Sequence, residues 1–327
     1  MTAAHPSAPV VIDVIVPLYN NERYAVDAIT SALTQSLPVR KVIVVDDGST
    51  DRSAEIIERH FATDSRVEVI RAAHGGLPWG RNRGVERSDA GFIAFLDSDD
   101  VWYADKLKRQ MALFDGKPDT GLVYCGYDDI DSDGKRIKLA SPFTPRLRGD
   151  VHAGLIGGNR ISGGSAALVR REFLVQAGEF DENLSYGEDW DMWLRLAAIC
   201  RFDYVDAPLF AIRRHAGQMS AGKDYFRKMR RLIQYRRIWA KWPMQVSQSD
   251  AVLRVVVGAM MSSSLNKSLS FRRRLAALHV IHKRIIAHTH PRLYRSAHGN
   301  DVVLFFRIAL RVLLYRLQSL CGMAHGE

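Results

Sequence analysis

The sequence predicts an α/β protein in which a mostly parallel sheet is flanked by helices. In the N-terminal half, short runs of β-branched and aromatic residues alternate with segments of helical composition. Strands separated by helical segments of about 10 to 15 residues indicate βαβ units. Polar clusters follow three of these strands, and ligands of such sheets bind outside the carboxyl ends of the strands. The pattern therefore predicts a binding crevice at one edge of the sheet.

The elements follow one another in a regular order. The expected strands are residues 10–18, 41–45, 66–71 and the first part of 91–100. The expected helices between them are residues 22–35, 51–61 and 77–87. Farther along we expect a helix over 103–114, a strand near 121–127, a loop or hairpin over 128–150, glycines at a close backbone approach followed by a strand within 161–170, and a helix after the acids of 187–191.

The run GFIAFLDSDD at 91–100 ends in three carboxylates, Asp97, Asp99 and Asp100. In extended backbone, Asp97 and Asp99 project to the same side. Two carboxylates that close repel each other unless a cation lies between them. Oxygen ligands suit a hard ion such as Mg²⁺ or Mn²⁺, which keeps positions free for phosphate oxygens. The alternative is an acidic turn after a strand.

Charge is distributed unevenly along the 327 residues, whose net charge is +10. From Arg213 to the end there are 22 lysines and arginines against 4 acidic residues, and the preceding part has 24 against 32. An acidic half suits a metal site, and a basic half suits an anionic surface. The length exceeds that of a typical single domain, so we expect one domain over 10–220 and a basic helical region over 221–327.

Neither the cysteines nor the N-terminal residues of the sequence indicate a secreted protein. Its 3 cysteines are widely spaced and form no metal-binding pattern, which favours a reducing cytoplasm. Residues 1–9 are small and polar and are expected to be a disordered tail, without the features of a signal peptide. No uninterrupted apolar run reaches the length of about 18 residues that a membrane span needs.

The last segment, residues 301–320, reads as a basic amphipathic helix. Arg307 and Arg311 lie four residues apart and share a helix face among bulky apolar residues. Such a helix suits the anionic inner face of a cell membrane or a partner surface. Packing of its apolar side on the protein's own core is an equal alternative.

Several polar residues elsewhere are individually ambiguous. Asp46 and Asp47 can accept hydrogen bonds from a ribose or base, or cap a helix. Arg81 can meet a diphosphate, or belong to a solvated helix face. The acids at 188 and 189 can supply a general base or cap a helix. His215 can meet a cation or phosphate, although a lone histidine is more often structural.

Taken in order, these pieces resemble glycosyltransferase family 2, whose members have the GT-A fold and use nucleotide-sugars. The matching segments are IVPLYNNE (15–22), VVDDGSTD (44–51), GRNRG (80–84), FLDSDD (95–100), GEDWDMWLRL (187–196) and RRHAGQMS (213–220). The combination is specific, although no single segment is. The resemblance covers about residues 10–220.

The resemblance implies a set of site residues. Asp189 would be the catalytic base, and Asp99 would bind the metal, Mn²⁺ or Mg²⁺, with His215 beside the metal or diphosphate. Asp47 would bind the base of the nucleotide, and Asp97 would lie near the ribose. The implied nucleotide-sugar-binding residues are Pro17, Tyr19, Glu22, Asp46, Asp47, Arg81, Asp97, Ser98 and Glu188.

The expected function is a metal-dependent inverting transfer of a sugar, from a UDP-sugar to a hydroxyl of a glycan or lipid-linked acceptor in cell-surface polysaccharide biosynthesis. A metal stabilises the leaving diphosphate, and a carboxylate takes the proton of the acceptor hydroxyl. The alternatives are a GDP- or dTDP-sugar donor, or a non-catalytic nucleotide-sugar-binding scaffold. Nucleic-acid binding by the basic tail is disfavoured, because its helices lack a recognition motif or an aromatic stacking platform.

Overall fold

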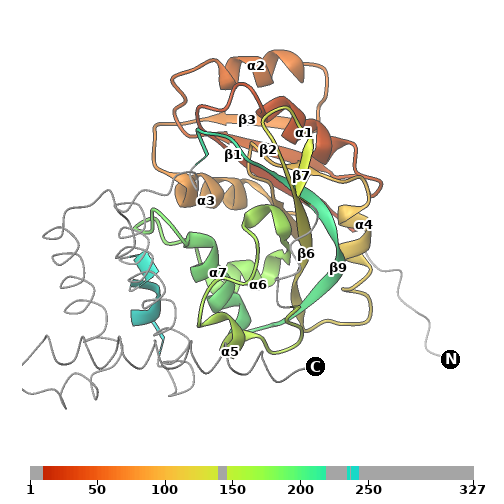
Figure 1. The fold of residues 1–327 in the computed structure, drawn as a ribbon, viewed down its shortest axis with the longest axis vertical. Coiled ribbons are helices and arrows are strands. Elements are labelled where there is room, and N and C mark those ends of the chain that lie inside the picture. The colour runs from red at the N-terminus through yellow and green to blue at the C-terminus, as the bar shows by residue number, and fades with distance from the viewer. Residues whose placement is uncertain (1–9, 139–145, 219–233, 236, 243–327) are drawn as a thin grey trace, which may run out of the picture. The chain divides into compact units, whose positions relative to one another are not determined.

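The computed structural model describes residues 10–138, 146–218, 234, 235 and 237–242 (Figure 1). The chain divides into two compact units, and the first holds the described residues up to 155 and from 159 to 218. The second unit holds 156–158 and the short helical piece near 240. The predicted tail over 1–9, most of the predicted helical region over 221–327 and the helix with Arg307 and Arg311 lie outside the described residues.

One sheet organises the first unit. Within the described residues it has nine strands, in the order β3-β2-β1-β4-β8-β6-β9-β5, with β7 paired to β6. The strands are β1 (Ile12–Leu18), β2 (Lys41–Asp46), β3 (Val67–Arg71), β4 (Phe92–Phe95), β5 (Val101–Trp102), β6 (Thr120–Ile130), β7 (Arg136–Lys138), β8 (Leu168–Arg170) and β9 (Arg201–Arg213).

The sheet is mostly parallel, as the sequence predicts. The first four strands along it, β3, β2, β1 and β4, pair in parallel, and so do β6 and β9. The short strand β8 joins the two groups by pairing antiparallel to both β4 and β6. Leu18 lies opposite Asp46 at the ends of β1 and β2. The carboxyl ends of β1, β2 and β4 therefore meet at one edge, where their polar clusters come together.

Helices connect the strands and cover the sheet. They are α1 (Ala25–Leu33), α2 (Ser53–His60), α3 (Leu77–Arg87), α4 (Lys106–Met111), α5 (His152–Leu155), α6 (Arg171–Ala177) and α7 (Glu188–Ala197), with a 3₁₀ turn, η1 (Gly164–Ala166). The helix α3 has the predicted bounds, whereas α1 begins three residues later than predicted. In the described part of the chain, no helix is long and apolar enough to cross a bilayer.

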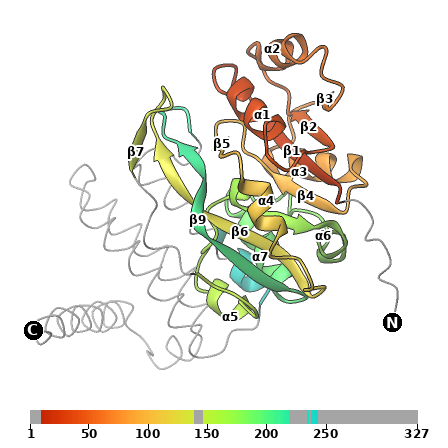
Figure 2. The same cartoon turned by 90° about the vertical axis from the view of Figure 1, so that its right-hand side faces the viewer.

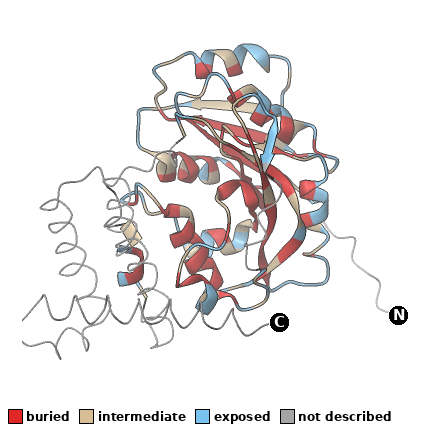
Figure 3. Ribbon diagram, viewed as in Figure 1, coloured by how far each residue is buried: buried red, intermediate tan, exposed pale blue. Residues whose placement is uncertain are grey.

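The core lies between the sheet and these helices, and the strands β1 and β4 are buried at every residue (Figure 3). Every residue of β1 is buried, which fits its β-branched sequence. The helix α3 packs against β1 through Gly84, where any Cβ would overlap the side chain of Ile15. Glycine is needed there because the helix backbone lies so close to the strand. This contact places the start of α3 near the polar edge.

The carboxylates after β4 lie in a turn, which corrects one prediction. The strand β4 ends at Phe95, and the N–H of Asp100 donates to the carbonyl oxygen of Asp97 at 3.0 Å. Asp97 and Asp99 are therefore not in extended backbone, and the prediction that they share a side for that reason is wrong. A turn rotates successive side chains in different directions, so each acid meets its own partner.

The segment predicted as a loop or hairpin over 128–150 starts with a hairpin. The strand β6 continues to Ile130, and β7 returns along it. The tip is stabilised by Asp131, whose Oδ1 accepts hydrogen bonds from the backbone N–H groups of Asp133 and Lys135 at 3.0 and 2.9 Å. β6 and β9 run side by side as a long pair, with β7 at one end (Figure 2).

Candidate active site

The loops after β1 and β2 are tied together at the polar edge. Asn20 adopts a left-handed backbone conformation with a φ of 48°. Its Oδ1 accepts a hydrogen bond from the N–H of Thr50 at 2.7 Å, and its own N–H donates to Ser49 Oγ at 3.0 Å. Glu22 Oε2 accepts from the N–H of Arg52 at 3.1 Å. The predicted site residue Glu22 thus contributes to joining these loops.

Asp47, which follows β2, holds the loop that precedes α3, whereas Asp46 holds the loop after β2. Asp47 is buried, and its carboxylate oxygens accept hydrogen bonds from the N–H groups of Gly75 and Gly76 at 2.6 and 2.9 Å. His74 Nδ1 lies 2.9 Å from Asp47 Oδ2. Asp46 Oδ1 accepts from the N–H of Ser49 at 3.2 Å. The two acids shape the walls of the edge, and their predicted contact with a nucleotide stays a prediction.

An exposed aromatic surface lies beside these loops. Tyr19 is 45% exposed, and its ring centroid lies 4.4 Å from that of His74, with the ring planes 31° apart. Pro17 is buried at the end of β1, and Gly80 of α3 approaches it closely. An aromatic ring can stack on the flat face of any nucleobase, whichever polar groups that base carries. The stacked pair of Tyr19 and His74 therefore offers an outer ring face on which a base can stack.

The turn after β4 distributes its side chains among four partners. Asp97 Oδ1 lies 2.8 Å from Arg81 Nη2, and Asp99 Oδ2 lies 3.1 Å from His215 Nε2. Asp100 Oδ2 accepts a hydrogen bond from Ser165 Oγ at 2.6 Å.

The fourth side chain of this turn, Ser98, accepts a hydrogen bond at its Oγ from Asn21 Nδ2 at 2.9 Å. The acids of the turn also affect one another. Burial raises the pKa of Asp99, and the charge of Asp97 raises it further. Negative charge is concentrated here, which is the electrostatic setting that attracts a cation.

Arg81 is the central cation of the site. Its side chain is 2% exposed, and its Nη1 lies 2.7 Å from Glu188 Oε1 while its Nη2 meets Asp97. Its guanidinium also lies over the rings of Phe95 and Phe180. Burial by itself would lower the pKa of Arg81, but the charges of the two carboxylates raise it above its usual range. Arg81 thus joins the turn after β4 to the start of α7.

Glycine at position 164 makes room for Arg81. A Cβ on Gly164 would lie 2.9 Å from Arg81 Nη2. The prediction that the glycines of 161–170 mark a close approach is confirmed here, and β8 follows them as predicted. The approaching group is an arginine side chain, which the sequence pattern could not identify.

Asp189 lies in the first turn of α7, next to Glu188. Its Oδ2 accepts a hydrogen bond from Asn159 Nδ2 at 3.0 Å. Burial raises the pKa of Asp189 to about 7, and the charge of Glu188 raises it while that of Arg81 opposes the rise. A carboxylate with a pKa near neutrality suits general-base chemistry, because its basicity is raised while much of it is still ionised at pH 7.

Asp99 and His215 fit the first two ligands of a divalent cation. Octahedral ligands at about 2.1 Å from an ion lie about 3 Å from one another. Asp99 Oδ2 and His215 Nε2 are hydrogen-bonded at 3.1 Å, which already places the two atoms at this spacing. In the described residues, no group of three or more His, Cys, Asp or Glu side chains is arranged around a metal position. A cation held by Asp99 and His215 would take its other ligands from phosphate oxygens and water.

Four contributors to the site were not assigned by sequence reasoning: Asn21, Asn159, Ser165 and Arg213. Asn159 lies outside every segment singled out in the sequence, and Ser165 lies within 161–170, where only the glycines drew attention, so spatial contacts identify both. Arg213 begins the matched segment 213–220, and Asn21 lies within 15–22. Their positions in those matched segments could have pointed to a role in the site. The sequence does not show, however, which residues they contact.

Comparison with known proteins identifies the family. Residues 13–176, just over half of the chain, match the sequence pattern described as Glycosyl transferase family 2. The chain belongs to glycosyltransferase family 2. The putative teichuronic acid biosynthesis glycosyltransferase TuaG of Bacillus subtilis is 36% identical over 187 residues, which are 57% of this chain and 71% of TuaG.

Longer relatives match over the same region. An uncharacterized glycosyltransferase of Rickettsia felis is 25% identical over 223 residues, which are 64% of this chain but 35% of that protein. A second one, from Rickettsia conorii, is 26% identical over the same shares of both chains. This chain thus spans about a third of the length of these two relatives.

Two solved structures share the fold of this family 2 member. One is TarS 1–349 of S. aureus in complex with UDP-GlcNAc, with a TM-score of 0.55 and 17% identity over 85% of this chain and 89% of that one. The other is the mannosyltransferase PcManGT of Pyrobaculum calidifontis in complex with GDP-Man and Mn²⁺, with a TM-score of 0.55 and 18% identity over 92% and 86%. The likeness confirms the predicted fold class.

Proposed function

We propose that this family 2 member is a metal-dependent inverting glycosyltransferase that moves a sugar from a nucleotide-sugar to a hydroxyl of a glycan or lipid-linked acceptor. The main support is the buried contact of Arg81 with both Asp97 and Glu188. Through it, the acids after β4 and the adjacent Asp189 share one cluster, so a donor-binding side and a base lie at the same edge.

The donor lies along the carboxyl edge in this proposal. Its base stacks on Tyr19 and His74, near Pro17, Glu22 and the acids Asp46 and Asp47. Its ribose and diphosphate extend toward the turn that carries Asp97, Ser98 and Asp99. Arg81 and Glu188 are both buried, so in this proposal they hold Asp97 and the start of α7 in place for the donor.

Asp189 acts as the general base. The acceptor hydroxyl gives its proton to the Asp189 carboxylate as its oxygen forms a bond to the anomeric carbon. The bond between that carbon and the diphosphate breaks at the same time, and the nucleoside diphosphate leaves with the electron pair. A single displacement without a covalent intermediate inverts the anomeric configuration. Asn159 orients Asp189 through its hydrogen bond at 3.0 Å.

Mn²⁺ or Mg²⁺ is the proposed cofactor, held by Asp99 and His215. When bound, it neutralises the negative charge that develops on the leaving diphosphate. The concentrated negative charge of the turn after β4 and the spacing of Asp99 and His215 support this assignment. The Mn²⁺ in the PcManGT complex supports it from a protein of the same fold.

The proposed donor is a UDP-sugar. TarS, which has the same fold, was solved with UDP-GlcNAc. The second candidate is a GDP-sugar, favoured by the GDP-Man in the PcManGT complex, and a dTDP-sugar is a further alternative. A stacking surface made of Tyr19 and His74 accepts any of these bases.

A screen for donor turnover tests the function. Purified full-length protein is incubated with UDP-, GDP- and dTDP-sugars and with Mn²⁺, Mg²⁺ or EDTA, and release of the nucleoside diphosphate is measured. We expect release from a UDP-sugar that needs the metal and that increases with a suitable acceptor. Equal release with EDTA would contradict the metal dependence, and turnover of GDP-sugars alone would replace the proposed donor.

The acceptor belongs to cell-surface polysaccharide synthesis in this proposal, as the name of TuaG suggests for that relative. The enzyme would then work in the cytoplasm at the inner face of the membrane, with no nucleic-acid partner. From Arg213 onward the chain has 22 basic residues and 4 acidic ones, and this positive balance supports attraction to anionic lipids. Co-sedimentation with anionic liposomes tests this, and undiminished binding after truncation near residue 300 would exclude the last segment.

A further inference from the structure

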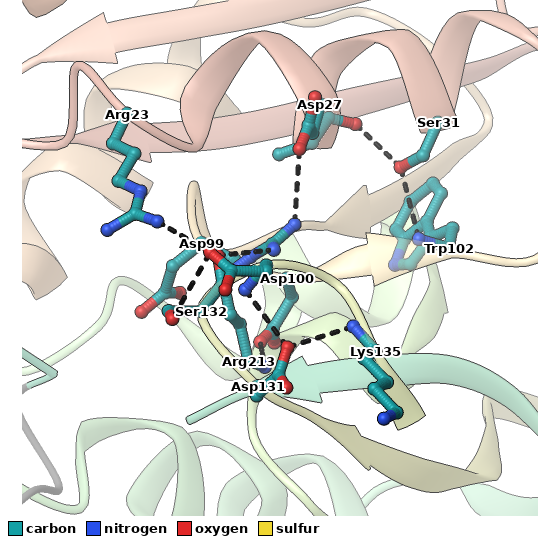
Figure 4. Close-up of polar contacts among 12 residues, drawn as sticks. Arg23, Asp27, Ser31, Asp99, Asp100, Trp102, Asp131, Ser132, Lys135 and Arg213 are labelled. Carbon is teal, nitrogen blue, oxygen red and sulfur yellow. Dashed lines mark hydrogen bonds and ion pairs between the residues drawn. The ribbon is translucent and has the colours of Figure 1, made fainter. Parts of the chain in front are cut away.

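Arg213, the last residue of β9, contacts three separate elements through one guanidinium group. Its Nε donates to the carbonyl oxygen of Asp99 at 3.1 Å, and its Nη1 donates to the carbonyl oxygen of Ser132 at 3.3 Å. Its Nη2 lies 3.3 Å from Asp27 Oδ2 on α1. Figure 4 shows Arg213 among Asp27, Asp99 and Ser132. The residue is 3% exposed, so these protein groups are its partners within the fold.

Tyr24 packs against both Arg213 and His215. The Arg213 guanidinium carbon lies 4.8 Å from the Tyr24 ring centroid, and the His215 ring centroid lies 4.8 Å from it. The backbone N–H of Arg213 also donates to Asp100 Oδ1 at 3.3 Å. The strand end that carries His215 and the turn that carries Asp99 are therefore connected through Arg213.

We propose that Arg213 is a positioning residue that sets the separation between Asp99 and His215 and thereby the affinity of the site for a divalent cation. The inference rests on the proposed function, in which these two side chains hold the cation. Arg213 holds the backbone of Asp99 directly, and His215 follows two residues along the chain. Buried as it is, Arg213 acts through these two residues without touching the donor.

The planar fork of the guanidinium is the feature that carries this role. Its three donating nitrogens reach in different directions to Asp99, Ser132 and Asp27. A lysine keeps the charge but has a single nitrogen, so it can meet the acid on α1 without holding the turn. Loss of groups that orient metal ligands costs about 10- to 100-fold in metal affinity. A purely electrostatic role, by contrast, would be preserved by lysine.

Arg214 provides a matched control. It is the next residue of the chain and carries the same charge, but its Nη2 lies 2.7 Å from Asp129 Oδ1. That contact ties it to β6 instead of to the turn after β4. Arg214→Met removes the same charge and a similar side chain from the same strand end while leaving the Asp99 backbone contact in place.

The experiment is a titration of the donor-free, full-length protein with Mn²⁺, followed by electron paramagnetic resonance of the free ion. We expect Arg213→Met to weaken Mn²⁺ binding about tenfold or more, and Arg213→Lys to weaken it severalfold. Arg214→Met should stay within about twofold of the wild type. In turnover assays, the Arg213 variants should raise the donor KM at limiting Mn²⁺ and recover most of kcat at saturating Mn²⁺.

Wild-type Mn²⁺ affinity in folded Arg213→Met would overturn the inference while leaving the proposed function intact. Wild-type affinity in Arg213→Lys, together with a loss in Arg213→Met, would show that the charge contact with Asp27 is sufficient and would overturn the role of the three-way guanidinium contacts. If Arg213→Met does not fold, the Mn²⁺ affinities of Arg213→Lys and Asp27→Asn test the inference instead, since each variant removes one set of the Arg213 contacts. A wild-type protein that binds no Mn²⁺ even with UDP present would overturn the proposed metal dependence, and this inference with it.

Discussion

Arg81 and Glu188 form a buried ion pair with 2.7 Å between Nη1 and Oε1, although 107 residues separate them in the chain. The pair joins α3 to the first residue of α7. Because Arg81 also meets Asp97, one buried cation balances carboxylates from both sides of the candidate site. Asp189, the next residue of α7, lies beside this cluster, and its pKa depends on it.

Removal of Arg81 should destabilise the fold strongly. Arg81→Met leaves Glu188 buried without its cation and Asp97 without its partner, and an uncompensated buried charge costs about 3–5 kcal/mol. The free energy of unfolding, measured by urea titration at pH 7, should fall by this amount. Arg83→Met on the same helix removes a part-exposed pair with Glu86, which is worth about 1 kcal/mol or less. Similar losses in the two variants would contradict the bridging role of Arg81.

The pH dependence of turnover should report Asp189. Burial raises its pKa to about 7 in the donor-free enzyme, so the carboxyl is protonated and inactive as a base at lower pH. We expect kcat/KM to rise with pH up to about 7 and then level off. Asp189→Asn should lower kcat by about 10²- to 10⁴-fold.

Glu179→Gln serves as the control for Asp189→Asn, because it changes an exposed acid nearby in the chain. It should leave both the rate and the pH profile unchanged. A profile that stays flat between pH 5.5 and 8, or an Asp189→Asn variant with full activity, would exclude Asp189 as the base.

Tyr19 should contribute to donor binding through stacking. Base–aromatic stacking is worth about 1–3 kcal/mol, so Tyr19→Ala should raise the donor KM or Kd by roughly 5- to 150-fold with little change in fold stability. Tyr19→Phe keeps the ring and should retain most of the affinity. Isothermal titration with the nucleoside diphosphate measures both variants. Equal affinities for wild type and Tyr19→Ala would remove Tyr19 from the donor site.

Because of Lys106, the free energy of unfolding should change with pH in the alkaline range. It is fully buried on α4, donates to Gln110 Oε1 at 2.8 Å, and burial lowers its pKa to about 8. Between pH 8 and 10.5 the unfolded chain holds this proton more tightly than the native one, so the contribution of Lys106 to stability rises with pH. Below about pH 8 the full penalty of a buried charge is present.

The test compares Lys106→Met with the wild type in urea unfolding from pH 7 to 10.5. Other buried groups titrate in this range, so the difference between the two proteins is the quantity of interest. The lowering of the Lys106 pKa to about 8 by burial corresponds to about 3 kcal/mol in the free energy of unfolding. The advantage of Lys106→Met should be largest near pH 7 and should shrink by about that amount toward pH 10.5. A constant difference would show that Lys106 has an ordinary pKa.

The sequence by itself determined the α/β class, most of the first strands and helices, and the edge at which polar clusters meet. These features follow from local periodicity and from strands that end at Asp46 or shortly before Asp97, because a parallel sheet brings such ends together. The family segments also identified most of the candidate acids. All of this information lies within short stretches of chain.

Only the tertiary structure decided which side chains meet. Asp97 and Asp99 were expected to face the same way, but a turn sends one to Arg81 and the other to His215, 116 residues away. The burial of Arg81, the contact of Asn159 with Asp189 and the three-way contacts of Arg213 likewise depend on the order of strands in the sheet. Local sequence sets backbone preference, whereas partners so distant in the chain are selected by packing, which no short segment encodes.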